Sequence, residues 1–321
     1  MKRINIYITE DTDKQIDSLS EIFQVNRSEI IRQAIEQFAE DHSSDIADFV
    51  DGLELSPDEQ AKTENTSDLL KCMNSPEHFM ENAVHIITKD RGVQPLHLYE
   101  FQKQLTFKLE NYNKLIINGS RQAGISTILC AYILHYCLAH PNTNTLLASH
   151  KLAASVELLF KIEQMHNKLP TYIKNTFRCI SNTKRYIEFS NGSRIYANSI
   201  ASPDSIKMID FDFVFLDEFA YAPVANVYEF MKIIDKISDT NPNLKLIIAS
   251  TPNGINYFFK LWADAITNFN GYHAIKIPWT LVPGRDGEWK RQSIQLMGLE
   301  RFLQEYECSF YEGMKGDLYA N

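Results

Sequence analysis

The feature that most restricts the fold is a series of short apolar runs separated by helical patterns in residues 67–321. The clearest runs are residues 115–117, 145–148, 213–216 and 244–249. Between them lie stretches with the apolar spacing of a helix, such as residues 154–160. Buried strands that alternate with helices predict an α/β fold, in which helices cover both faces of a mostly parallel sheet.

The rest of the chain divides into two further segments. Residues 1–42 form one unit, and residues 43–66 are acidic and polar, which is typical of a linker with room for one short helix. Residues 67–321 are then the main domain. The five cysteines are dispersed without metal-ligand spacing, which favours a reducing cytoplasm, and no apolar run approaches the ~20 residues of a membrane span.

A glycine-framed loop follows the first strand of the main domain. Gly119, Gly124 and Ser126 match the phosphate-loop pattern G-x-x-x-x-G-K-[ST], but Ile125 stands where the lysine belongs. A strand at 114–117 precedes the loop and an apolar helix at 128–138 follows it, which is the context that such a loop requires. We therefore expect a nucleotide phosphate site made of Gly119, Ser120, Gln122, Ala123, Gly124, Ile125, Ser126 and Thr127. A tight turn would explain the glycines equally well.

Acidic residues end the strand at 213–216. Asp217 is placed to hold Mg²⁺ together with Ser126, and Glu218 is placed to activate a water molecule. The alternative is a pair of solvated acids at a strand end.

Two further stretches are candidates for contact with a nucleotide. Ser250, Thr251 and Asn253 follow the last strand, where small polar side chains can sense a γ-phosphate, although Pro-Asn-Gly is also ordinary turn chemistry. Phe101 and Gln102 precede the loop and could contact adenine. Their alternative is a helix with Phe101 in the core.

Residues 1–42 read as one strand and two helices. Ile4, Ile6 and Ile8 alternate with polar residues, as in a strand with one buried face. So small a unit cannot bury a core alone, which predicts a dimer with paired strands. With "NRSEIIRQAI", the segment resembles the ribbon-helix-helix family of DNA-binding domains. The resemblance implies base contacts from Arg3, Asn5 and Tyr7 and phosphate contacts near Arg27 and Ser28.

The charge of this segment leaves an alternative open. It carries nine acidic residues against five Lys and Arg, and the whole chain has a formal net charge of −9. DNA-binding domains are usually basic, so a dimerisation module without DNA binding fits the composition too.

The main domain resembles the ATPase domain of tailed-bacteriophage large terminase subunits. The resemblance rests on "SRQAGIST" (120–127), "FVFLDEFAYAP" (213–223) and "IIASTPNGINYFFKLWADA" (247–265). It implies a P-loop NTPase fold of the RecA or ASCE type, with ATP and Mg²⁺ as cofactors. It also implies that Arg121 supplies the charge of the missing lysine and that Ser250, Thr251 and Asn253 couple the phosphate state to movement.

The resemblance further implies a motor that packages double-stranded DNA, working with a portal, a small terminase subunit and a homo-oligomeric ring in the host cytoplasm. The family continues into a nuclease, and we expect none in residues 1–321, so a separate nuclease chain is a further expected partner. The alternative is a DNA-bound regulatory dimer that tethers an inactive or degraded ATPase fold, as in a prophage remnant. Ile125 favours this alternative, and the intact Asp217–Glu218 pair argues against it.

Overall fold

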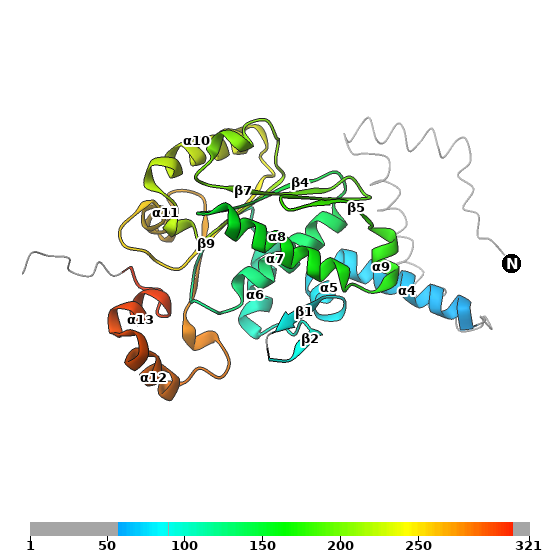
Figure 1. Cartoon of the computed structure of the whole chain (residues 1–321), viewed down its shortest axis with the longest axis horizontal. Coiled ribbons are helices and arrows are strands. Elements are labelled where there is room, and N and C mark those ends of the chain that lie inside the picture. Colours follow the sequence, from blue (N-terminus) through cyan, green and yellow to red (C-terminus); the bar gives the residue numbers. More distant parts are fainter. Residues whose placement is uncertain (1–56, 89, 311–321) are drawn as a thin grey trace, which may run out of the picture. The chain divides into compact units, whose positions relative to one another are not determined.

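A computed structural model of the chain describes residues 57–88 and 90–310 (Figure 1). The chain divides into two compact units, residues 1–64 and residues 65–321, and the candidate site lies in the second. The predicted strand and helices of residues 1–42, with their DNA-contact residues, fall outside the described residues.

The four predicted strands correspond to β3, β4, β8 and β9, and helices lie between them along the chain. The helices are α4 (Pro57–Asn74), α5 (Pro76–Asn82), α6 (Glu100–Asn111), α7 (Ile125–Ala139), α8 (Leu152–Asn167), α9 (Thr171–Thr176), α10 (Val224–Thr240), α11 (Tyr257–Ile266), α12 (Gly287–Met297) and α13 (Leu299–Glu305). The strands are β1 (His85–Thr88), β2 (Gly92–Pro95), β3 (Lys114–Gly119), β4 (Asn144–Ser149), β5 (Cys179–Thr183), β6 (Tyr186–Phe189), β7 (Arg194–Ser199), β8 (Phe213–Asp217), β9 (Lys245–Ser250) and β10 (His273–Ile277). Short 3-10 turns are η1 (Pro203–Ile206), η2 (Phe219–Tyr221) and η3 (Trp279–Leu281).

Eight strands form the main sheet, in the order β10-β3-β9-β8-β4-β7-β6-β5. From β10 to β7 every neighbouring pair is parallel, and β6 and β5 add an antiparallel edge. The carboxyl ends of β3, β9, β8 and β4 therefore meet at one edge. In this register Asn118 lies beside Ser250, and Ser149 lies beside Asp217. Ligands of open parallel sheets bind at this edge.

Successive residues of a strand pack into two separate hydrophobic cores, one on each face of the sheet. In β3, Leu115 and Ile117 pack with α6, α7 and α8, whereas Ile116 packs with α10 and α11 on the other face. Both faces of the strands are buried, which explains why their sequences are continuously apolar. The expected α/β fold with helices on both faces is thus confirmed (Figure 1).

Two predicted boundaries differ from the structure. Helix α7 begins at Ile125 and not at Ile128, because the end of the loop already adopts helical geometry. Helix α4 runs through residue 66, the predicted end of the acidic linker, because Pro57 and the acidic residues that follow it are helix-starting signals. Within the described residues, no helix is both long enough and apolar enough to span a membrane.

Candidate functional site: a phosphate loop at the sheet edge

The loop between β3 and α7 has the backbone of an anion site. Its conformation requires positive φ at Gln122 (57°) and Gly124 (80°), which turns the chain sharply into α7. The N–H groups of residues 120 and 121 donate to the carbonyls of Ile277 and Glu305. In the described part of the chain, the N–H groups of residues 122, 124, 125 and 126 donate to no protein acceptor. Free amides at a helix N-terminus are a ready site for phosphate oxygens.

Ile125 fills the space beneath this loop. Its side chain is half-buried and reaches back to Gly119, where a Cβ would collide with Ile125 Cδ1. A side chain at Gly119 would therefore force Ile125 or the loop to move. Gly119 is needed for this close approach, and Gly124 for its left-handed backbone.

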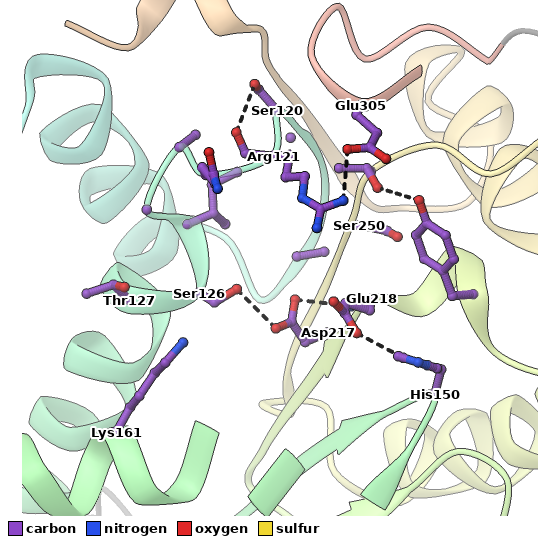
Figure 2. A pocket seen from close by; sticks show the side chains of 18 of the residues that line it. Ser120, Arg121, Ser126, Thr127, His150, Lys161, Asp217, Glu218, Ser250 and Glu305 are labelled. Atoms are coloured by element: carbon purple, nitrogen blue, oxygen red, sulfur yellow. Dashed lines mark hydrogen bonds and ion pairs between the residues drawn. The ribbon is translucent and has the colours of Figure 1, made fainter. Parts of the chain in front are cut away.

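Ser126 and Asp217 meet at the base of the loop. The Ser126 hydroxyl donates to Asp217 Oδ2 over 3.0 Å, and the Glu218 N–H donates to Asp217 Oδ1 over 3.1 Å (Figure 2). Burial raises the pKa of Asp217 to about 6, against the opposing effect of the Ser126 hydrogen bond. The structure thus brings the two expected Mg²⁺ ligands together. A hydroxyl and a carboxylate are hard oxygen donors, which suit this ion.

Glu218 lies at the mouth of the same cavity. Its backbone is left-handed (φ 51°), and its side chain is half exposed, with Oε2 2.9 Å from His150 Nδ1. A non-glycine residue at positive φ is strained, and such strain is found most often at functional sites. His150 comes from the end of β4, so two adjacent strands fix the position of this carboxylate.

The polar residues after β9 are hydrogen-bonded to the segment that follows Glu218. The Ala220 N–H donates to Ser250 Oγ over 3.1 Å, and the Tyr221 hydroxyl lies 3.0 Å from Thr251 Oγ1. The Asn253 side chain donates to the Ala220 carbonyl over 3.2 Å. Ser250 and Thr251 also line the cavity, together with the phosphate loop and Glu218.

Arg121 is held by the C-terminal helix α13. Its Nη1 lies 2.8 Å from Glu305 Oε2, and Arg301 Nε binds the other oxygen of the same buried carboxylate over 2.8 Å. Arg285 approaches the loop from behind and donates to Ser120 Oγ and to the carbonyls of residues 121 and 122, over 3.0–3.1 Å. The guanidinium of Arg285 also stacks on Trp289 and Tyr306.

Phe101 and Gln102 do not line the cavity in the described structure. Phe101 is buried, as in the alternative of a helix that packs into the core. Both ends of the Gln102 amide are used: Nε2 donates to the Ala123 carbonyl over 3.2 Å, and Oε1 accepts from the Tyr99 N–H over 3.0 Å. Gln102 therefore ties α6 to the phosphate loop. A contact with adenine stays a prediction.

These residues surround one cavity of about 560 Å³ (Figure 2). It is lined by Gly119, Ser120, Arg121, Gln122, Ala123, Gly124, Ile125, Ser126, Thr127, His150, Lys161, Asp217, Glu218, Tyr221, Ala249, Ser250, Thr251, Arg301 and Glu305. Asn253 is not one of the lining residues. The titratable lining residues that were not predicted from the sequence are His150, Lys161, Arg301 and Glu305. Only "ASH" at the end of a predicted strand was a signal for His150, and the others come from helices whose position the sequence does not give.

Comparison with known proteins assigns the chain to a family. Residues 116–321 match the family "Terminase large subunit, T4likevirus-type, N-terminal", and residues 2–41 match "Ribbon-helix-helix protein, copG family". The large terminase subunit of Escherichia phage T5 is 28% identical over 207 residues, which are 62% of this chain and 45% of that protein. The chain thus spans less than half of the length of this relative.

Solved structures of phage terminases share the fold. The large terminase of bacteriophage HK97 superposes with a TM-score of 0.59 at 17% identity, over 73% of this chain and 54% of that one. The ATPase domain of the large terminase of Thermus phage P74-26 gives 0.55 at 16% identity, over 67% and 94%. The family match covers more than half of the chain, and the shared fold agrees with it. The chain belongs to the phage large terminase family, through its N-terminal ATPase domain, and carries a ribbon-helix-helix domain before it.

Proposed function

We propose that this chain is a Mg²⁺-dependent ATPase that drives the packaging of double-stranded DNA. The observation that carries the proposal is the convergence of the free loop amides, the Ser126–Asp217 pair and Glu218 on one cavity. Phosphoryl transfer depends on positioning and on charge stabilisation, and this cavity offers groups for both. A similar large terminase, from a thermophilic bacteriophage, was crystallised in complex with ADP.

The residues divide the work by their chemistry. The amides of Gln122, Gly124, Ile125 and Ser126 bind phosphate oxygens. Ser126 and Asp217 hold Mg²⁺, which when bound neutralises charge on the β- and γ-phosphates. Glu218, positioned by His150, accepts a proton from the attacking water.

Arg121 faces the same cavity and stabilises the charge of the γ-phosphate. In the structure Glu305 accepts from Arg121, so Arg121 must exchange this partner when a nucleotide binds. Arg301 also pairs with Glu305 and keeps that buried carboxylate neutralised after the exchange. Arginine suits the role, because it is always charged and can grip two oxygens.

Ser250, Thr251 and Asn253 couple hydrolysis to movement. Their contacts with Ala220 and Tyr221 join the strand end that senses phosphate to the segment after Glu218. By analogy with the family, the expected partners are double-stranded DNA, a portal, a small terminase subunit or separate nuclease chain, and further copies of this chain in the host cytoplasm. The ribbon-helix-helix domain is the expected site of dimerisation and of DNA contact, through Arg3, Asn5, Tyr7, Arg27 and Ser28.

One observation favours the second candidate, a DNA-bound regulator with an inactive ATPase fold. Ile125 fills the space under the loop with an apolar side chain, where a phosphate loop normally carries its lysine. Such a protein would bind DNA through residues 1–42 without turnover of ATP.

Release of phosphate from ATP, with and without duplex DNA, separates the two candidates. We expect Mg²⁺-dependent turnover in the native chain. Glu218→Gln keeps the shape of the side chain but removes the base, so nucleotide affinity should change little while turnover falls by about 10²–10⁴-fold. Glu229→Gln is the matched control, because Glu229 is exposed on α10 and pairs only with Lys232 within the described residues. Unchanged turnover in Glu218→Gln would remove Glu218 from the mechanism.

A further inference from the structure

The proposed site lacks the cation that a phosphate loop normally carries at its first helical position. Ile125 is apolar and its side chain is used in packing against Gly119. Arg121 is paired with Glu305 and lies on the side of the cavity nearest α13, away from Ser126. The phosphates of a bound nucleotide would still need a positive charge near the start of α7.

Lys161 reaches this region from a different helix. It lies on α8, which follows β4 and packs beside α7, as the contact between Cys130 Sγ and the Leu158 carbonyl (3.7 Å) shows. Lys161 comes one turn after Leu158, and side chains of a helix tilt toward its N-terminus. The ammonium group is therefore directed back toward the edge of the sheet. Figure 2 shows it pointing toward Ser126, and the residue lines the cavity.

The surroundings of Lys161 are unusual for a lysine with only a structural role. It is half-buried, and within residues 57–88 and 90–310 its ammonium group has no hydrogen-bond or ion-pair partner. A lysine on a solvent-facing helix surface usually extends its ammonium group into water. Lys161 instead faces the cavity that is also lined by the phosphate loop. The ammonium group of Lys161 and the Ser126–Asp217 pair thus line the same cavity.

We propose that Lys161 binds the β- and γ-phosphate oxygens of the nucleotide and replaces the missing lysine of the loop. The inference rests on the proposed ATP site and names the residue that supplies its second positive charge. The geometry requires no movement of α8, because a flexible four-carbon side chain already points into the cavity. The sequence then keeps the charge of an ordinary phosphate loop while moving it from α7 to α8.

The test removes the charge of Lys161 in one variant and returns a charge to position 125 in a second. Lys161→Met keeps the length of the side chain and removes the ammonium group. We expect turnover to fall by about 10²–10³-fold, the usual loss when one donor to a developing anion is removed. Affinity for ATPγS should fall as well. Lys168→Met is the matched control, because Lys168 ends the same helix, contacts Gln164 and does not line the cavity. Its turnover should equal that of the native chain.

The double variant Lys161→Met with Ile125→Lys returns the charge to the position that the family pattern gives it. We expect it to recover at least part of the lost turnover and affinity, a result that a packing role for Lys161 would not produce. Thermal unfolding of each variant shows whether the fold is intact. Native turnover and affinity in a folded Lys161→Met protein would overturn the inference.

The two proposals fail in distinguishable ways. If the native chain hydrolyses ATP, Glu218→Gln abolishes turnover and Lys161→Met does not reduce it, the ATPase proposal stands and the role of Lys161 is wrong. If the native chain binds ATPγS without turnover, the loss of affinity in Lys161→Met still tests the inference. If it binds no nucleotide at all, both proposals are wrong.

Discussion

Ile125 and Gly119 are matched to each other where the phosphate loop folds back on β3. Because Ile125 Cδ1 occupies the space that a Cβ at Gly119 would need, each residue limits what the other can be. The apolar contact anchors the loop to the core beside α6 and α7. A loop fixed in this way keeps its free amides directed at the cavity, even though the lysine that usually accompanies them is missing.

Arg121 can be tested at the same scale. We expect Arg121→Ala to reduce turnover by about 10³–10⁵-fold, the range in which an arginine finger contributes. Stability should change little, because the Arg121 side chain is half exposed and Arg301 still neutralises Glu305. Turnover, measured as phosphate release, and thermal unfolding separate the two effects. Arg291→Ala, which removes an exposed guanidinium from α12, is the control.

Other cationic side chains also lie near the Arg121 site. Arg121 is the one cationic residue within the loop sequence, but the cavity also contains Lys161 and Arg301 from other elements. An Arg121→Ala protein with native turnover would assign the charge to these residues and would leave Arg121 with its bond to Glu305 alone.

Among the elements, α13 joins parts of the site that are distant in the sequence. Glu305 binds Arg121 of the phosphate loop, and Gln304 donates to the Pro252 carbonyl after β9 over 2.8 Å. Arg285, just before α12, holds the carbonyls of the same loop. A nucleotide that draws the Arg121 side chain away from Glu305 would therefore remove one of the bonds between α13 and the loop. The bond from the Arg121 N–H to the Glu305 carbonyl and the contact at Pro252 would remain.

Helices α4 and α7 are joined by a buried histidine whose protonation should control stability. His135 Nε2 lies 3.0 Å from the Cys72 carbonyl and 3.1 Å from the Met73 carbonyl, so this nitrogen carries the hydrogen. Burial lowers the pKa of His135 from 6.5 to about 4. The unfolded chain thus binds more protons between these values, and stability is lost as the pH falls from 6.5 toward 4. Over this whole pH range the free energy of unfolding should fall by about 3 kcal/mol because of His135.

Urea unfolding at pH 7 and pH 5 measures this effect. His135→Gln keeps a donor for the carbonyls but does not titrate, so the free energy of unfolding should depend less on pH than in the native chain. His97→Gln alters an exposed histidine that lies before α6 and should keep the native dependence. An equal dependence in His135→Gln and in the native chain would show that other groups cause the acid sensitivity.

For the whole molecule, we expect residues 1–42 to set the arrangement of subunits. The alternation of Ile4, Ile6 and Ile8 predicts a strand with one buried face, which needs a partner, so the full chain should sediment as a dimer or as a higher even assembly. Ile6→Lys places a charge in that face and should shift the assembly toward monomers. Asn5→Lys changes the predicted opposite face and is the control. A native chain that stays monomeric across micromolar concentrations would contradict the expected pairing.

The sequence by itself determined the class of fold and the central motif of the site. Continuous apolar strands, helical spacing and a glycine-framed loop are local patterns, and the structure confirms the parallel sheet that they predict. The sequence pattern also predicted that Asp217, at the carboxyl end of β8, lies near Ser126, because parallel strands end at the same edge of a sheet. The two side chains are hydrogen-bonded there. The roles that we gave to these residues stay predictions.

Only the tertiary structure decided which side chains from other elements complete the cavity. Lys161, Glu305 and Arg301 belong to helices whose sequences look like ordinary amphipathic surface helices, and no local pattern marks them. Their positions depend on the strand order, which sets α8 beside α7, and on the return of the chain after β10, which brings α13 to the loop. Long-range packing fixes such contacts, and sequence spacing does not record them. From the sequence alone, a replacement for the missing lysine could be proposed only within the loop, at Arg121. The fold brings a second candidate, Lys161, from the neighbouring helix α8.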